Sequence, residues 1–496
     1  MLGLQPGQPV GWLQLLALAL LAGQLDGARS WQRGAWLGGW FAVAMQCATF
    51  WWLFISLHVY GGLAAPLTVL AIVLLAAFLA LYYAAAAGVF VLLAPARPAL
   101  RATFFAAMWL LAELARVKLF TGFPWGEGGY AHVDGWARPL AAWIGVHGLT
   151  FVAALVAAWL AFCLLAPKTR WRAALAGIVL STAVAWLPVH NGDDLEPDPA
   201  LAQPMSVTLL QGNIPQDEKF QGSTGIFTAL RWYGEQLRDA RTTLVVAPET
   251  ALPLLPQQLP DGYWQALQAR FATGDQAALI GLPLGDLETG YSNSVVGLKP
   301  DQPDPYRYDK HHLVPFGEVI PPGFHWFINL MHIPLGDFNR GAVGQASFDW
   351  KGQRLAPNIC YEDLFGEELG ARFVDPARAP TVFVNVGNIG WFGNTVAIDQ
   401  HLQISRMRSL EFGRSMIRAT NTGATVIINP RGEVTHSLPR HTRGVLVGEA
   451  QGRSGITPYA WWVARFGLWP LWALGGVALA LALGFKRRRW PDRRVK

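Results

Sequence analysis

The chain has 496 residues, of which 52% are hydrophobic and 15% are charged, and it contains 23 Trp. Soluble proteins carry roughly 25% charged residues, so this composition excludes a soluble protein throughout and indicates a large membrane-embedded part. The formal net charge of +6 does not indicate nucleic-acid binding. Much of the excess lies in the run from Lys486 to Lys496, which follows an apolar segment and is accompanied by no nucleic-acid motif.

In chain order, the first elements are apolar segments. A helix needs about 20 apolar residues to cross a membrane, and these segments are long enough. We predict seven spans, near 10–25, 35–57, 66–94, 102–120, 138–166, 173–189 and 460–485. The first is short, but it lacks the basic start of a signal peptide, so we count it as a span. Basic loops alternate with neutral or mixed ones, and placing the C-terminal tail in the cytoplasm puts every basic loop there.

The pattern changes near residue 204, where short runs rich in β-branched residues alternate with helical stretches. We predict strands at 205–211, 243–249, 278–283, 293–299, 354–360, 381–386, 415–420 and 424–430. We predict helices at 223–241, 262–274, 362–373 and 396–413. Nearly continuous apolar strands mixed with helices indicate an α/β layered domain whose sheets are covered on both faces.

Three segments of this domain place a reactive side chain at or just past a predicted strand end. They carry Glu249 in APET, Lys310 in YDKHHLVPFGE and Cys360 in NICYED. A thiol attacks a carbonyl as its thiolate, a nearby carboxylate can take its proton, and a lysine can stabilise an oxyanion. Each residue alone also has a structural interpretation: a core cysteine, a helix-capping glutamate and a solvated lysine. Their combination and order favour acyl-transfer chemistry.

These residues resemble the Glu-Lys-Cys triad of the nitrilase, or carbon–nitrogen hydrolase, superfamily. The segments TGFPW (121–125), 308–318, 359–363 and 391–423 are similar to those of the apolipoprotein N-acyltransferase family. The resemblance implies a nitrilase-like αββα sandwich tied to a helical transmembrane bundle. We predict the bundle at 1–190 with about six spans, the extracytoplasmic catalytic domain at 191–457, and a closing span with a basic cytoplasmic tail at 458–496. The family usually has eight spans, so we expect that the natural start lies upstream or that this member lacks one helix.

The resemblance implies that Cys360 takes an acyl chain from a phospholipid, preferably the sn-1 chain of phosphatidylethanolamine, as a thioester. The α-amine of an S-diacylglyceryl cysteine on an apolipoprotein then attacks this thioester. In this scheme Glu249 is the general base and Lys310 stabilises the tetrahedral intermediate. The partners are therefore a phospholipid donor, a lipidated apolipoprotein and the bilayer of a bacterial inner membrane, with the catalytic domain in the periplasm. No cofactor and no nucleic acid is expected.

Further residues are assigned by the same resemblance. Glu318 is expected to orient Lys310, Tyr361 to offer its backbone N–H to the oxyanion, and Glu362 to support the loop. Substrate or lid residues are predicted at Phe220, Asn293, Trp391 and Phe392, with the apolar segment 324–328 as a further lid candidate. In the family, Trp often stands where this chain has Phe220. Ordinary packing or an aromatic belt at the membrane surface explains these aromatic segments equally well.

Other polar residues are given no place in the site. His311 and His312 are adjacent, and neighbouring side chains of an extended strand point to opposite faces, so we predict no metal there or elsewhere. Cys47, Cys163 and Cys360 do not form a disulfide framework. Glu113 and Arg116, near the end of a span, are either a functional pair or a structural one.

Two other functions remain open from the sequence. A membrane-tethered carbon–nitrogen hydrolase, such as an amidase, would use the same triad with water as the acceptor. A non-enzymatic transporter or scaffold would retain a decayed domain, which the intact Glu249, Lys310 and Cys360 argue against.

Overall fold

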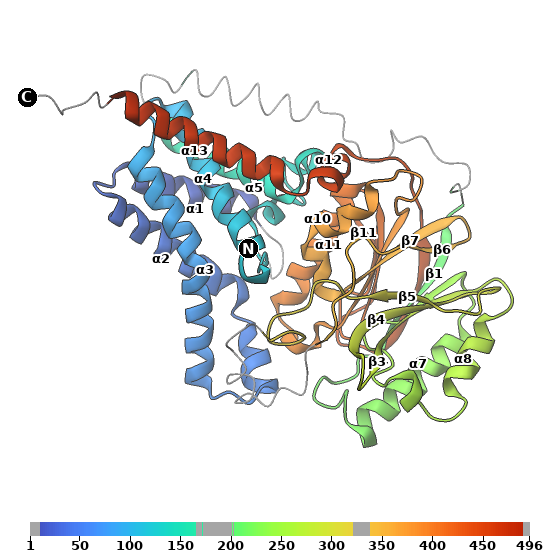
Figure 1. The fold of residues 1–496 in the computed structure, drawn as a ribbon. Helices are drawn as coiled ribbons and strands as arrows, with labels where there is room; N and C mark the ends of the chain where they lie inside the picture. Colours follow the sequence, from blue (N-terminus) through green and yellow to red (C-terminus); the bar gives the residue numbers. More distant parts are fainter. Residues whose placement is uncertain (1–9, 165–170, 172–200, 202, 321–337, 490–496) are drawn as a thin grey trace, which may run out of the picture. The chain divides into compact units, whose positions relative to one another are not determined.

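The structure, a computed structural model, describes residues 10–164, 171, 201, 203–320 and 338–489. It divides into two compact units, each of which is described by itself (Figure 1). The helical unit comprises Met1–Trp51, Pro66–Val189 and Phe466–Lys496. The α/β unit comprises Trp52–Ala65 and His190–Arg465.

The helical unit is built from long, mostly apolar helices. They are α1 (Gly11–Asp26), α2 (Trp31–Phe50), α3 (Ala65–Leu93), α4 (Pro98–Lys118), α5 (Ala141–Trp159) and α13 (Trp469–Arg489). Among the described residues, three helical segments are long and apolar enough to cross a membrane: Ala65–Leu93, Arg138–Cys163 and Trp469–Lys486. These three agree with predicted spans to within one residue beyond their bounds, whereas α1 is apolar but only 16 residues long. The chain is therefore a membrane protein, with three candidate spans in the part that the structure describes.

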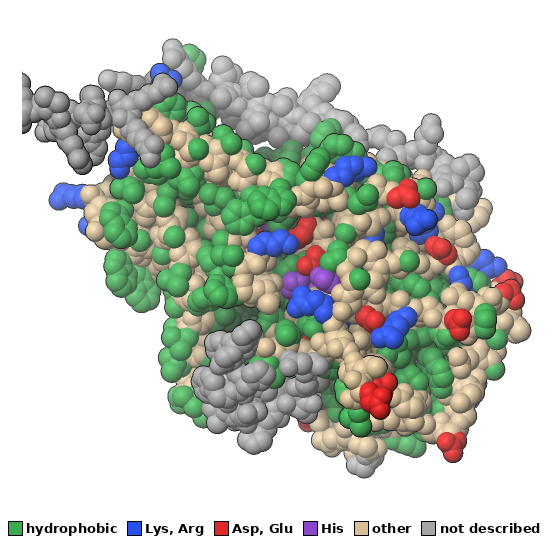
Figure 2. All heavy atoms as spheres, in the orientation of Figure 1, with side chains coloured by type: hydrophobic (Ala, Val, Ile, Leu, Met, Phe, Trp, Pro, Cys, Tyr) green, Lys and Arg blue, Asp and Glu red, His purple; other side chains and the backbone are tan. Residues whose placement is uncertain are grey.

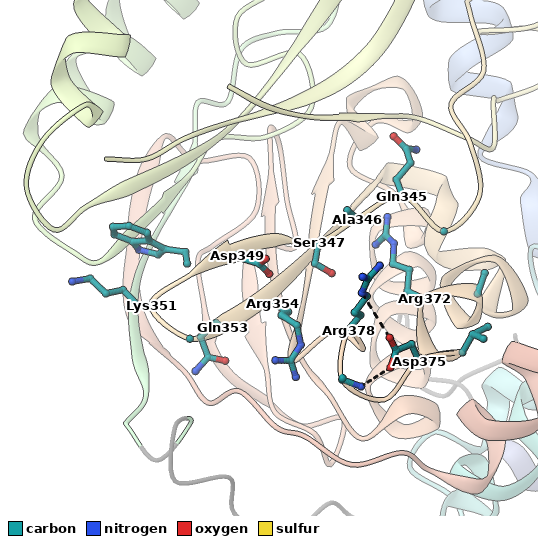
Figure 3. A pocket seen from close by; sticks show the side chains of 16 residues that line it. Gln345, Ala346, Ser347, Asp349, Lys351, Gln353, Arg354, Arg372, Asp375 and Arg378 are labelled. Carbon is teal, nitrogen blue, oxygen red and sulfur yellow. Dashed lines mark hydrogen bonds and ion pairs between the residues drawn. The ribbon is translucent and has the colours of Figure 1, made fainter. Parts of the chain in front are cut away.

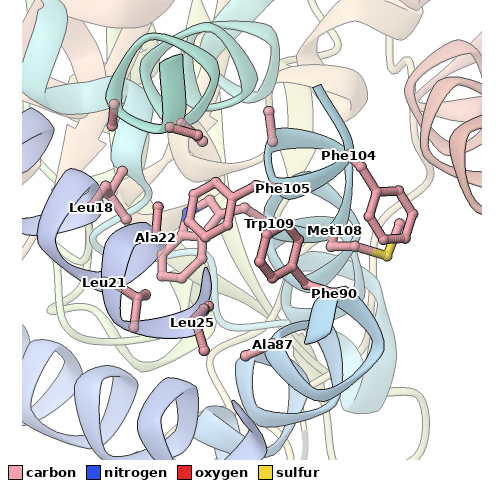
Figure 4. Close-up of a cluster of buried hydrophobic side chains, with 14 of the residues drawn as sticks. Leu18, Leu21, Ala22, Leu25, Ala87, Phe90, Phe104, Phe105, Met108 and Trp109 are labelled. Carbon is pink, nitrogen blue, oxygen red and sulfur yellow. The ribbon is translucent and has the colours of Figure 1, made fainter. Parts of the chain in front are cut away.

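Aromatic rings and small residues pack the helices of this unit together. Trp109 stacks on Phe105 with ring centroids 6.1 Å apart, and Phe90 packs beside them in the same cluster (Figure 4). On α2, a Cβ atom at Gly38 would lie 2.4 Å from the Cβ atom of Ala87 on α3, so only glycine allows this approach. Close contact through small residues is the usual way in which helices associate in lipid. In Figure 2, hydrophobic side chains cover much of the visible surface of this unit, as contact with lipid requires.

The predicted span at 35–57 is interrupted in the structure. Helix α2 ends at Phe50, and Ile55–Tyr60 form a π-helical turn. The side chain of Trp52 is only 1% exposed, because it packs within the α/β unit. Tertiary packing thus ends a helix that the apolar pattern continues. The predicted span at 173–189 and the lid candidate 324–328 lie outside the described residues.

The α/β unit contains two six-stranded mixed sheets (Figure 1). The first has the order β12-β1-β2-β3-β4-β5, and the second has the order β11-β10-β9-β8-β7-β6. Strands of the first are β1 (Met205–Gln211), β2 (Leu244–Val246), β3 (Ala277–Asp286), β4 (Gly290–Leu298), β5 (Tyr306–Asp309) and β12 (Gly444–Ala450). Strands of the second are β6 (Phe348–Trp350), β7 (Gln353–Ile359), β8 (Val382–Gly387), β9 (Ser415–Thr420), β10 (Val426–Ile428) and β11 (Val434–Ser437). In each sheet, three consecutive parallel strands are flanked by antiparallel ones.

Alternating side chains of each strand build the layers of this unit. Val207 and Leu209 of β1 face the second sheet in a core that also contains Ile359 and Val384. Leu210 points the other way, into a core with the helices α7 (Phe227–Asp239) and α8 (Tyr263–Phe271). Helix α11 (Val396–Phe412) lies on the opposite side of the stacked sheets, and α10 (Gly366–Gly370) and α12 (Pro458–Phe466) are shorter (Figure 1). The predicted αββα sandwich is confirmed.

All eight predicted strands are present, although β2 and β10 are shorter than expected. The structure adds β5, β6, β11 and β12, which lack a long apolar run; all four residues of β11 are exposed. The helix predicted at 362–373 is instead a series of short helical turns from Cys360 to Phe373. The carboxylate of Glu362 accepts hydrogen bonds from the backbone N–H groups of Ile359, at the end of β7, and His311, after β5.

Candidate active site

Three strand ends bring the predicted triad into one site, in which Glu249 and Lys310 are buried and Cys360 is half-buried. Glu249 lies three residues after β2, Lys310 directly follows β5, and Cys360 directly follows β7. Two positions have the left-handed backbone that favours glycine: Thr250, at φ +47°, and Cys360, at φ +52°. Such conformations cost on the order of 1–3 kcal/mol each and are concentrated at functional sites.

The ammonium group of Lys310 lies between two carboxylates. Its Nζ atom is 3.2 Å from Oε1 of Glu249 and 2.9 Å from Oε1 of Glu318. The side-chain amide of Asn293 donates to both of these oxygens, at 2.7 Å each. Val314 donates its backbone N–H to the other oxygen of Glu318 at 2.9 Å. Lys310 and both carboxylates are therefore fixed relative to one another.

Two further groups hold Glu249. The backbone N–H of Asn388, just past β8, donates to Oε2 of Glu249 at 2.9 Å, and the same backbone also hydrogen bonds with Cys360. The Nζ atom of Lys219 donates to the backbone carbonyl of Glu249 at 3.1 Å. Sequence reasoning missed Lys219 and Asn388. Lys219 directly precedes the predicted Phe220, so its place beside that residue was the available signal.

Burial and charge set the protonation of the triad. Burial and the Glu249 carboxylate raise the pKa of the Cys360 thiol above its usual range, against the opposing effect of Lys310. Burial alone would raise the pKa of Glu249, but Lys310, Asn293 and Lys219 outweigh it, so this pKa lies below its usual value. Burial would lower the pKa of Lys310, and the charges of Glu249 and Glu318 raise it instead. At neutral pH the site therefore holds a thiol, a carboxylate and an ammonium group.

Glu362 joins the end of β7 to the loop after β5. Its Oε2 atom accepts hydrogen bonds from the backbone N–H of Ile359 at 2.6 Å and from the hydroxyl of Tyr308 at 2.8 Å. Its Oε1 atom accepts from the backbone N–H groups of His311 at 2.6 Å and His312 at 3.2 Å. This geometry fits the predicted supporting role. The side chain of Tyr361 is buried and packs edge-on against Phe365.

The predicted substrate and lid residues lie in different surroundings. Asn293 is part of the buried charge network, whereas Phe220 is 40% exposed. Trp391 and Phe392 are half-buried, in a helical turn that follows Asn388. They contact residues between α2 and α3: Trp391 packs edge-on against Tyr60, with ring centroids 5.7 Å apart, and Phe392 packs on Trp52 at 4.3 Å. Their roles as lid or substrate residues stay predictions.

The structure corrects the expectation that His311 and His312 lie on an extended strand and point to opposite faces. Strand β5 ends at Asp309, so His311 and His312 do not alternate across a strand. Both instead approach the carboxylate of Glu368, His312 through Nδ1 at 3.0 Å and His311 through Nε2 at 4.0 Å. Within the described part of the chain, no group of three or more His, Cys, Asp or Glu side chains is arranged to hold a metal ion.

A cavity of about 800 Å³ lies elsewhere in the α/β unit, at the β6–β7 hairpin (Figure 3). Its lining includes Lys351, Arg354, Arg372 and Arg378, and Arg378 lies 3.7 Å from the carboxylate of Asp375. No predicted site residue lines this cavity. It is therefore separate from the strand-end site.

In the helical unit, Glu113 and Arg116 form a buried ion pair at 2.6 Å. Arg116 also donates to the backbone carbonyls of Phe123 at 3.0 Å and Trp125 at 2.8 Å. The guanidinium group thus ties the TGFPW segment to α4. Of the two interpretations left open by the sequence, these contacts favour the structural one.

Comparison with known proteins agrees with this architecture. Residues 1–159 match the apolipoprotein N-acyltransferase N-terminal domain, and residues 206–458 match the carbon-nitrogen hydrolase family. An apolipoprotein N-acyltransferase of Verminephrobacter eiseniae is 60% identical over 479 residues, covering 93% of this chain and 89% of the relative. The chain belongs to the apolipoprotein N-acyltransferase family. A second member, from Ralstonia nicotianae, is 45% identical over 482 residues, covering 96% of this chain and 90% of the relative. Membership confirms the resemblance and the predicted enzyme class, an acyltransferase.

Proposed function

We propose that the chain transfers a fatty acyl group from a phospholipid to the α-amine of the N-terminal S-diacylglyceryl cysteine of an apolipoprotein. The apolipoprotein N-acyltransferases among its relatives support the apolipoprotein acceptor. The observation that carries the mechanism is the arrangement of buried Glu249 and Lys310 with half-buried Cys360 at three strand ends. We further propose that the acyl donor is the sn-1 ester of phosphatidylethanolamine. The protein lies in the bacterial inner membrane with its α/β unit in the periplasm.

The first half-reaction forms a thioester. The Cys360 sulfur attacks the ester carbonyl while its proton passes to Glu249, which is ionised at rest because its pKa is lowered. The pKa of the thiol is raised, so the proton leaves as the S–C bond forms rather than before. Lys310 and the backbone N–H of Tyr361 stabilise the oxyanion. The C–O bond then breaks, Glu249 returns the proton to the leaving alkoxide, and lysophospholipid departs.

The second half-reaction forms an amide. The acceptor amine attacks the thioester carbonyl and loses a proton to Glu249, and the same groups stabilise the second oxyanion. The C–S bond breaks, and the thiolate of Cys360 regains the proton from Glu249. Bulk water would hydrolyse the thioester, so its exclusion separates transfer from hydrolysis. Glu249 is 7% exposed and Lys310 is 1% exposed, as such exclusion requires.

Mass spectrometry of the detergent-purified protein, incubated with phosphatidylethanolamine, tests this proposal. We expect a fatty-acyl mass on Cys360 that hydroxylamine removes and a diacylglyceryl-cysteine peptide discharges. Cys360→Ala and Cys360→Ser should insert and fold normally but form no adduct and show no transfer. Discharge by water alone would make the protein a hydrolase. A folded wild type without any adduct would show that the nucleophile or the donor is wrong.

A further inference from the structure

The segment 391–423 supplies a buried polar chain behind Cys360 that the proposed mechanism does not use. His401 and Ser405 lie one turn apart on α11, and Arg418 lies on β9. Together with Asp363, which follows Cys360, they form a hydrogen-bonded group in which no member is more than 1% exposed. Burying so many polar groups is costly unless they are fully paired, so the arrangement calls for a reason.

The chain ends at the backbone carbonyl of Cys360. This oxygen lies 3.1 Å from Nε2 of His401 and accepts a hydrogen bond from Nδ2 of Asn385, also at 3.1 Å. Asn385 lies on β8, so α11 and β8 hold the same peptide group. That peptide belongs to a residue at φ +52°, a conformation that a cysteine keeps only when its surroundings fix it.

The neighbours of His401 settle which of its nitrogens carries the proton. Nη2 of Arg418 lies 2.7 Å from Nδ1, and a guanidinium group only donates, so Nδ1 is an acceptor. The proton therefore lies on Nε2, and this one N–H is shared between two acceptors, the carbonyl of Cys360 at 3.1 Å and Oδ1 of Asp363 at 2.9 Å. Ser405 donates to the other oxygen of Asp363 at 2.5 Å and accepts from Arg418. Every contact agrees with a neutral imidazole that donates through Nε2.

We propose that His401 is a positioning residue that holds the Cys360 carbonyl, and hence the thiol, in the left-handed conformation that Cys360 has at the end of β7. Asp363 and Arg418 fix the tautomer and the direction of the imidazole. Asn385 provides the second donor to the same oxygen. This inference rests on the proposed role of Cys360 as the nucleophile.

A matched pair of amide variants in the full-length protein tests the inference. The amide nitrogen of a glutamine at position 401 can take the place of Nε2, whereas that of asparagine is too short to reach the Cys360 carbonyl. We measure acylation of Cys360 by phosphatidylethanolamine in mixed micelles by mass spectrometry, together with Tm. The exposed His436 supplies a control, His436→Asn.

We expect His401→Asn to lower the maximal acylation rate by about 100-fold at an unchanged half-saturating donor concentration, because a small displacement of a nucleophile costs about this much. His401→Gln should restore most of the rate, and His436→Asn should leave it unchanged. Equal rates for the Gln and Asn variants, whether fast or slow, would overturn the inference. If His401→Asn does not fold, His401→Gln carries the test alone, and a rate about 100-fold below wild type at an unchanged Tm would overturn the inference. A wild type that forms no thioester would instead count against the proposed function.

Discussion

The positively and negatively charged side chains at the site are equal in number. Two buried lysines, Lys219 and Lys310, face two buried glutamates, Glu249 and Glu318. Paired charges avoid most of the penalty for removing an isolated ion from water. A thiolate at Cys360 would add one negative charge to this balance, in agreement with the raised pKa of the thiol. Proton transfer from the thiol is therefore coupled to bond formation.

Lys219 should make stability depend on pH in a predictable direction. Burial lowers its pKa from 10.5 to about 8, although the charges of Glu249 and Cys360 oppose the shift. Between these values the unfolded chain binds more protons than the folded one. The free energy of unfolding therefore rises with pH across this window, by about 3 kcal/mol, while the charged lysine costs stability below it.

We expect Lys219→Met to remove this rise, so the stability difference between the wild type and the variant should change with pH between about 8 and 10.5. The measurement is the difference in Tm between the two proteins in detergent across that range. The same change at the exposed Lys351 is the control. A Tm difference that stays constant with pH would contradict the assignment.

At the scale of elements, Glu362 connects β7 to the loop after β5 and so relates Cys360 to Lys310. We expect Glu362→Gln to lower both Tm and acylation, because an amide nitrogen would face backbone donors. An unpaired buried donor costs about 1–3 kcal/mol. Thermal unfolding and the thioester assay measure the two effects, with the exposed Glu288→Gln as the control. Unchanged stability and rate would show that the two elements hold their positions without this carboxylate.

The strongest elements of the fold could be predicted because their pattern is local. The apolar strand at 205–211 has the predicted bounds, as does the strand at 415–420. The order of the triad along the chain was likewise enough to place its members in one site. Contacts between distant segments leave no such pattern: Asn388 and Lys219 reach Glu249 from loops 139 and 30 residues away. The strand β5, with its sequence YRYD, forms by pairing with β4 and has no apolar run of its own.

At the scale of the whole molecule, the chain passes from one unit to the other after Trp51, Ala65, Val189 and Arg465. The short segment Trp52–Ala65 lies between two apolar helices in the sequence, yet it belongs to the α/β unit. Hydropathy alone could not reveal this, because Trp52 is as apolar as the residues of the helix before it. Trp52 differs from those residues in its hydrogen-bond partner, Gln400 of the α/β unit, which lies 348 residues further along the chain.

Trp52 should therefore contribute to the stability of the α/β unit. Its indole N–H donates to Oε1 of Gln400 at 2.9 Å, and its ring packs on Phe392. We expect Trp52→Ala to destabilise the unit by about 3–5 kcal/mol, the usual cost of removing a buried aromatic side chain. Trp52→Phe, which keeps a ring but loses the hydrogen bond, should cost about 1 kcal/mol for that bond.

The neighbouring Trp51 provides the matched control, since it is 49% exposed and belongs to the helical unit. Tm in detergent should fall in the order Trp51→Ala, Trp52→Phe, Trp52→Ala, with the last lowest. Acyl transfer should fall with it, because Phe392 follows Asn388, whose backbone N–H donates to Glu249. If Trp51→Ala and Trp52→Ala lowered Tm equally, the segment would act as part of an apolar helix, and its place in the α/β unit would be wrong.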